Sequence, residues 1–124
     1  MPRTTKSEAP VLAEVDGYVA RVAAIGPYSA SFESFAQDAD PTELFAGLPD
    51  GRCQCPHWGT IVTGQIVFRF ADREETFRAG DVYYAEPGHL PLVFAGTEVV
   101  EFSPTDKLEE TMAVVGAALQ NAAG

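Results

Sequence analysis

Between residues 57 and 102, short runs of β-branched and aromatic residues follow one another, and a turn rich in Gly, Pro or Asp ends each run. Within residues 65–70 the side chains of Ile66, Phe68 and Phe70 fall on one face of a strand, and the remaining three fall on the other. Short strands at such close and even spacing are typical of a β-sandwich or barrel. The pattern therefore predicts an all-β fold for most of the chain.

The segments around this region extend the prediction. Residues 11–25 alternate like a strand and end at Gly26-Pro27, and residues 29–35 form a second strand with Phe32, and Phe35 after it, expected to point inward. Residues 37–51 hold three Asp, two Pro and two Gly. We expect a loop there, with one helical turn at 41–46 that Asp40 caps.

In the last segment the apolar residues recur with a different period. Leu108, Met112, Val115 and Leu119 recur at helical spacing, which predicts one amphipathic helix over about 106–121. We expect it to cover a barrel surface or a dimer seam. A chain of 124 residues fits one domain, so we expect a flexible tail at 1–10 and a single domain over 11–124.

The charge of the chain excludes some partners. Eighteen acidic and eight basic residues give a net charge of −10, which disfavours nucleic acid and anionic membrane surfaces. The first ten residues are polar and lack the apolar stretch of a signal peptide. We therefore expect a cytoplasmic protein with reduced thiols.

Two motifs carry a resemblance to a known family. Residues 53–64 read CQCPHWGTIVTG, and residues 80–89 read GDVYYAEPGH, followed by EFSP at 101–104. This arrangement resembles the cupin superfamily, in particular a small-cupin subgroup that is widespread in bacteria. The resemblance implies a cupin-type β-barrel (jelly-roll) with a C-terminal α-helix, and a homodimer.

The motifs also depart from the usual cupin pattern. Counted back from Gly64, His57 stands where cupins place their Glu ligand, and His89 lies two residues before the usual His of the second motif. The familiar set of three His and one Glu is therefore absent. Any metal must be held by a different set of ligands, and oxygenase chemistry does not transfer by analogy.

A metal site is predicted from the spacing of the remaining candidates. On a strand Cys53, Cys55 and His57 share one face, and His89 at the end of a neighbouring strand completes four ligands. Two thiolates and two imidazoles suit Zn²⁺ best, with Fe²⁺ or Ni²⁺ as second choices. If Pro56 turns one thiol away, three ligands and an open position remain. The alternative is that the cysteines are small core residues and the histidines bond locally.

Two other residues are candidates for catalysis. One of Tyr83 and Tyr84 must point inward, and Tyr84 is the candidate acid. Glu101 lies between Val100 and Phe102 and is a candidate base or partner of a histidine. Trp58 should face the opposite side from His57 and pack against the N-terminal segment or a partner subunit.

These observations favour a metal-dependent pocket that acts on a small organic molecule. Two alternatives stay open. One is a non-catalytic module that senses a small molecule or a metal, and the other is a metal-free isomerase or cyclase that uses Tyr84 and Glu101. A closed four-ligand shell would favour the sensing role, whereas an open position that faces an apolar cavity would favour the enzyme.

Overall fold

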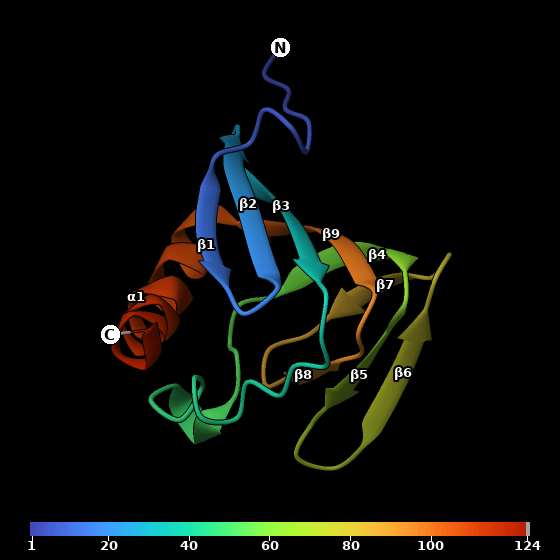
Figure 1. Cartoon of the computed structure of the whole chain (residues 1–124), viewed down its shortest axis with the longest axis vertical. Coiled ribbons are helices and arrows are strands. Elements are labelled where there is room, and N and C mark those ends of the chain that lie inside the picture. The colour runs from blue at the N-terminus through green and yellow to red at the C-terminus, as the bar shows by residue number, and fades with distance from the viewer. Residues whose placement is uncertain (124) are drawn as a thin grey trace.

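The structure is a computed structural model and describes residues 1–123. It has nine strands, a short 3-10 helix η1 at Pro49–Gly51 and one C-terminal helix α1 at Thr105–Ala123 (Figure 1). The strands are β1 Val11–Val15, β2 Tyr18–Ile25, β3 Tyr28–Phe35, β4 His57–Thr63, β5 Gln65–Arg69, β6 Glu74–Arg78, β7 Val82–Ala85, β8 Leu90–Val93 and β9 Thr97–Pro104.

The strands form two antiparallel sheets. The larger sheet has the order β1-β2-β3-β9-β4-β7, and the smaller has the order β6-β5-β8. In Figure 1 helix α1 lies beside the N-terminal strands, and it contacts β1, β3 and β9. The predicted all-β fold with a C-terminal helix is therefore confirmed.

Local sequence explains the boundaries that differ from the prediction. The strand-like segment 11–25 is a hairpin, because Asp16 (φ 46°) and Gly17 (φ 83°) both adopt left-handed backbone and reverse the chain. The helical turn expected at 41–46 is a single turn in which Phe45 N–H donates to Pro41 O at 2.9 Å. Asp40 Oδ1 accepts from Thr42 N–H at 3.0 Å, as a capping residue does.

The apolar core lies between the two sheets. It consists of seven buried residues: Ile61, Ile66, Phe68, Tyr83, Ala85, Val93 and Val99. Four of these seven also line a cavity, so the core is continuous with a hollow. Strand β3 turns Ser31, Glu33 and Phe35 toward this hollow, so the inward placement predicted for Phe35 is confirmed and that predicted for Phe32 is wrong.

Helix α1 closes the cavity. Its side chains Leu108, Thr111, Met112, Val115 and Leu119 all line it. The apolar stripe read from the sequence therefore faces a cavity between the helix and the sheet. None of the helices in the described residues is long and apolar enough to cross a bilayer.

Candidate metal centre and its cavity

Three predicted ligands meet inside the fold. A thiol sulfur and one ring nitrogen from each histidine, contributed by Cys53, His57 and His89, all lie within 4.8 Å of one another. Cys53 Sγ is 3.6 Å from His57 Nε2, and the two imidazole rings have centroids 4.9 Å apart. His89 is only 1% exposed, Cys53 is 3% exposed and His57 is 9% exposed. The group is thus sheltered from bulk solvent.

Backbone pairing holds two of the ligands together. Cys53 forms an isolated antiparallel bridge with His89, in which Cys53 N–H donates to His89 O at 2.8 Å. Gly88 N–H returns a bond to Cys53 O, also at 2.8 Å. The third ligand, His57, is the first residue of β4 and pairs with Ala85 on β7, just before the loop that carries His89. The two sequence motifs are therefore brought together by ordinary sheet hydrogen bonds.

Each histidine has its Nδ1 atom held by a hydrogen-bond partner. His89 Nδ1 lies 2.7 Å from the carbonyl oxygen of Glu86. Because a carbonyl only accepts, Nδ1 must carry the proton, and Nε2 of the neutral ring has a free lone pair. His57 Nδ1 lies 2.6 Å from Ser103 Oγ, while its Nε2 faces Cys53. Metal-binding histidines almost always have such a partner on the second nitrogen.

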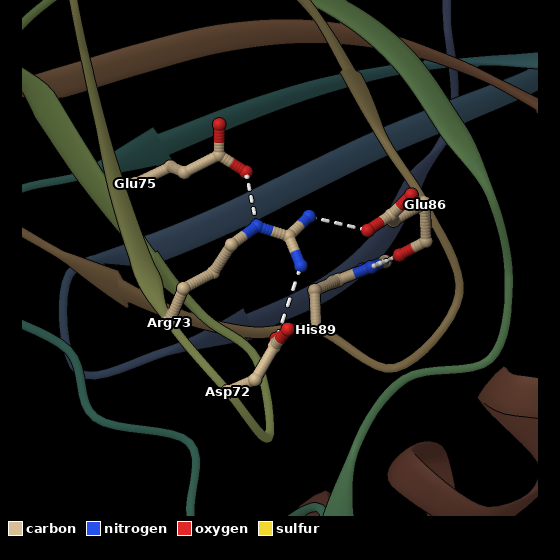
Figure 2. Close-up of polar contacts among 5 residues, drawn as sticks. All are labelled: Asp72, Arg73, Glu75, Glu86 and His89. Atoms are coloured by element: carbon tan, nitrogen blue, oxygen red, sulfur yellow. Dashed lines mark hydrogen bonds and ion pairs between the residues drawn. The ribbon is translucent and has the colours of Figure 1, made fainter.

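A surface network supports the loop that holds His89. Figure 2 shows Arg73, in the turn between β5 and β6, paired with Asp72, Glu75 and Glu86. Glu86 is the residue whose carbonyl accepts the His89 N–H in the same view. The Arg73 guanidinium also lies over the Phe70 ring, 4.1 Å from its centroid. The hairpin turn is therefore tied to the residue that orients His89.

Burial sets the protonation of the three groups. It lowers the pKa of His57 to about 4 and, with a smaller effect of the neighbouring His57, the pKa of His89 to about 4. Both rings are neutral at pH 7, as metal ligands must be. Burial raises the pKa of the Cys53 thiol to about 12, so without a metal the group is a thiol. A metal ion must displace that proton to bind the sulfur.

The separations fit a tetrahedral ion. With Zn–N bonds of about 2.0 Å and Zn–S bonds of about 2.3 Å, a tetrahedral angle places the two ligand atoms roughly 3.5 Å apart. The observed distance from Cys53 Sγ to His57 Nε2 is 3.6 Å. Two neutral imidazoles and one sulfur also form a donor set that zinc and other late first-row metals prefer. The three residues therefore provide a donor set that suits a divalent metal, in a group whose ligand atoms lie within 4.8 Å of one another.

The structure does not bring Cys55 into this group. The chain bends at Cys55 and β4 begins only at His57, so the strand alternation expected over residues 53–57 does not hold. Cys55 Sγ is 3.5 Å from the carbonyl oxygen of Pro56 and lies near Thr111 and Pro104, away from the cavity. Pro56 has no N–H and its ring fixes the backbone, which accounts for the bend. Three ligands, instead of four, converge.

The tyrosine that points inward is Tyr83 and not the candidate acid Tyr84. Tyr84 is 51% exposed and packs on Trp58 on the outer face, whereas Tyr83 is buried in the core. Tyr83 donates a hydrogen bond to Glu101, which is 8% exposed and lines the cavity. Gly59 of β4 lies between the two residues: its backbone is paired with Tyr83 on β7 and with Glu101 on β9, so the side-chain hydrogen bond passes over it. A Cβ on Gly59 would lie 2.7 Å from Tyr83 Oη, so only glycine leaves room.

Sequence reasoning missed one acidic residue of the cavity. Glu33 on β3 points inward beside Glu101, and Tyr18 Oη donates to Glu33 Oε2 at 2.5 Å. Burial first and the facing Glu101 second raise the pKa of Glu33 to about 7. Burial likewise raises the pKa of Glu101. The available signal was the strand alternation: if Phe35 faces inward, Glu33 two residues before it does so too.

The three metal-ligand candidates and the two inner carboxyls line one cavity of about 430 Å³. This volume is within the range of small-molecule sites. Its wall combines the three metal-ligand candidates and the two inner carboxyls with aromatic and aliphatic side chains from the sheets and from α1. The arrangement is suited to hold a metal ion next to a small organic molecule.

Comparison with known proteins identifies the fold. No family model matches the sequence, and no curated protein matches it. Among solved structures, an RmlC-like cupin from Shewanella frigidimarina NCIMB 400 aligns with a TM-score of 0.54 at 13% identity, covering 82% of this chain and 88% of that one. KdgF from Halomonas sp. aligns with a TM-score of 0.54 at 14% identity, covering 81% and 90%. FeII HppE aligns with a TM-score of 0.58 at 15% identity, covering 83% of this chain and 60% of that one. The chain therefore has the cupin-type jelly-roll fold that the sequence predicted.

Proposed function

We propose that this cupin-type chain binds one divalent metal ion through Cys53, His57 and His89, and that the remaining coordination position takes water or a small organic ligand from the cavity. One thiolate and two imidazoles favour Zn²⁺, with Fe²⁺ or Ni²⁺ as second choices. The likeness to HppE, whose structure was solved in its FeII form, keeps iron in that list.

One observation carries the proposal. Both histidines have Nδ1 fixed by a partner, His57 by Ser103 and His89 by Glu86, while the cysteine sulfur lies within ligand distance of the His57 Nε2. Histidines with a purely structural role would not require a thiol and a second imidazole in the same buried group. In metal sites the ligating histidines are usually oriented by hydrogen-bond partners on their second nitrogen, as they are here.

The number of ligands favours an enzyme over a sensor. A closed shell of four protein ligands is typical of structural zinc, whereas three ligands and an open position are typical of catalytic zinc. Cys55 lies outside the group, so the shell has three protein ligands. An ion held in this way is able to polarise a bound oxygen or activate water.

A metal-free isomerase or cyclase is the second candidate. The pair that supports it is Tyr83 and Glu101, joined by a buried hydrogen bond, and Tyr84 is too exposed to take part. That pair is able to hold a proton at the cavity wall. It explains neither the converging thiol nor the two oriented histidines, so the metal-dependent function is preferred.

The test is the metal content of the purified protein. We expect about one equivalent of metal per chain in the wild type and a large loss in His57→Ala and in His89→Ala. Val62→Ala is a matched control, because Val62 is on β4 with its side chain 52% exposed. Equal metal content in wild type and both histidine variants would rule out the proposed centre.

We also propose a homodimer, and a cytoplasmic location in which thiols stay reduced. Aromatic side chains of Tyr28, Trp58 and Tyr84 contact one another on the outer face of the larger sheet, and Phe102 beside them is 41% exposed. Large apolar groups gathered on one face are typical of interaction surfaces. Light scattering should give twice the chain mass for the wild type and a lower mass for Trp58→Glu, and a monomeric wild type would contradict the proposal.

A further inference from the structure

Helix α1 and the loop at residues 41–48 contribute large apolar side chains to the cavity wall that are not part of the core. The two segments are adjacent, because a Cβ on Gly47 would lie 3.0 Å from Cγ1 of Val114 on α1. Six residues make up what we call the apolar wall: Leu44, Phe45, Leu108, Met112, Val115 and Leu119. Side chains that line a hollow lack the contacts of a packed core on that side. A ligand with an apolar body would supply them.

The apolar wall lies directly beside the metal-ligand candidates. The hydroxyl of Thr111 on α1 is hydrogen-bonded to the Cys53 thiol, and Thr111 also lines the cavity. Leu108 and Val115 stand one turn before and one turn after Thr111, so they share its face of the helix. A molecule that contacts a metal ion at Cys53 and extends through the cavity therefore meets the apolar wall.

The polar groups of the inner wall are already bonded within the chain. Tyr18 Oη donates to Glu33 Oε2 at 2.5 Å, and Tyr83 Oη donates to Glu101 Oε2. The two carboxyls are also hydrogen-bonded to each other. Over residues 1–123, no buried side-chain nitrogen or oxygen lacks a hydrogen-bond partner. A polar ligand would lose its hydrogen bonds to water here, and these bonded groups would not replace them.

The charges around the cavity disfavour both kinds of ionic ligand. The described residues of the wall include no Lys and no Arg, so an organic anion finds no cationic side chain. An organic cation would be repelled by a divalent metal ion and would lose its hydration against apolar side chains. Two exposed carboxylates of the wall are occupied by the chain itself, because Asp38 accepts from Ala95 N–H and Asp40 from Thr42 N–H. An uncharged ligand avoids all of these costs.

We propose that the organic ligand of this cavity is an uncharged hydrophobic molecule, with its apolar body against the apolar wall and its one polar group toward the metal centre. This inference rests on the proposed function, because it names the ligand class of the cavity that holds that centre. It also assigns a role to the apolar stripe of α1, which binds the ligand and sets the length that the cavity accepts.

The experiment titrates the zinc-loaded protein at pH 7 in a calorimeter with a series of alcohols: 1-pentanol, 1-hexanol and 1-heptanol. The dissociation constant should fall by about threefold to fourfold with each added methylene, as transfer of that group from water to an apolar site predicts. Hexanoate and hexylamine have the same carbon chain as 1-hexanol but carry a charge. Each should bind at least about tenfold more weakly than the alcohol.

Variants of the apolar wall test its two segments separately. Met112→Ala on α1 and Leu44→Ala in the loop should each weaken the binding of 1-hexanol by about threefold or more, because each removes apolar contacts. Both variants should contain as much zinc as the wild type, which shows that they keep the fold. Glu109→Ala is the matched control, because Glu109 is exposed on α1 and does not line the cavity.

The outcomes separate this inference from the proposed metal centre. It is overturned if no alcohol binds, if affinity does not depend on chain length, or if hexanoate or hexylamine binds more tightly than 1-hexanol. Equal effects of Met112→Ala and Glu109→Ala also overturn it. If His57→Ala contains no less metal than the wild type but the alcohols still bind by length, the ligand class stands and the metal centre fails. Zinc-loaded protein without chain-length dependence leaves only the metal centre.

Discussion

Cys53 Sγ and His57 Nε2 lie 3.6 Å apart, although the chain between them bends at Cys55 and passes through a proline. That bend is what separates the two cysteines: it keeps the first sulfur at the histidines and sends the second toward helix α1. The short motif is thus built to deliver one thiol and one imidazole to the same point. The predictions below follow from this geometry and from its supporting contacts.

The partner of His57 should tune metal affinity. Ser103→Ala removes the hydroxyl that lies 2.6 Å from His57 Nδ1, so the ring loses its fixed orientation. Loss of such a partner typically costs about tenfold or more in metal affinity. Competition titrations with a zinc chelator measure the effect. Ser34→Ala, on the same sheet but not in contact with His57, should bind zinc as the wild type does.

The surface network at Arg73 should have a smaller effect on the same quantity. Arg73→Ala releases Glu86, whose carbonyl fixes His89 (Figure 2). Exposed ion pairs contribute at most about 1 kcal/mol, so we expect zinc affinity to fall by about threefold. Arg69→Ala is the matched control, because the Arg69 side chain pairs with Glu74 on the same hairpin and not with Glu86. Equal effects of both variants would contradict a role of Arg73 in positioning His89.

Gly59 should not tolerate a side chain. A Cβ at this position would lie 2.7 Å from Tyr83 Cζ and Oη and 2.9 Å from Val100 O. Gly59→Ala should therefore lower the free energy of unfolding by roughly 1–3 kcal/mol, as overpacking of a core does. Urea unfolding is the measurement. Gly116→Ala provides a contrast of opposite sign, because Gly116 lies in α1 with open space around it and alanine favours a helix by about 0.5–1 kcal/mol.

Glu33 should make stability depend on pH. Its pKa is raised from 4.5 to about 7 in the fold, so the folded state favours the protonated carboxyl. This contribution is fully present below about pH 4.5 and is lost as the pH rises through 7. Relative to Glu33→Gln, the wild type should lose roughly 1–2 kcal/mol of unfolding free energy between pH 5 and 8, after allowance for the partial exposure of the side chain. A difference between the two proteins that does not change with pH would contradict a protonated Glu33.

The fold was predictable because its signals are local. Alternation in residues 65–70 and the turn residues around them set the sheet, and the helical recurrence from Leu108 to Leu119 set α1. The candidate ligands His57 and His89 were found because each stands in a motif, and the structure brings them together. The acidic residue of β3 was missed because an inward residue was expected to be apolar. Phe32 was placed inside for that reason, but the inner face of β3 presents Glu33 beside Phe35.

The other two differences have separate physical causes. Cys55 was grouped with the ligands because a continuous strand would place it there, and the bend before β4 removes the strand. Tyr83 and Tyr84 are adjacent, so one of them had to face inward, and their order in the sequence does not say which. The choice is made by Gly59 on the neighbouring strand, which leaves room for the Tyr83 ring. Contacts between distant strands of this kind have no signal in a single sequence.

The central claim is that one cysteine, and not the other, is a metal ligand together with the two histidines. Cobalt(II) reports this directly, because a thiolate bound to Co²⁺ produces an intense sulfur-to-metal absorption in the near ultraviolet. Wild type and Cys55→Ser should both show this band with one equivalent of Co²⁺, and Cys53→Ser should lack it. A band that persists in Cys53→Ser, or one that disappears in Cys55→Ser, would contradict the proposed centre.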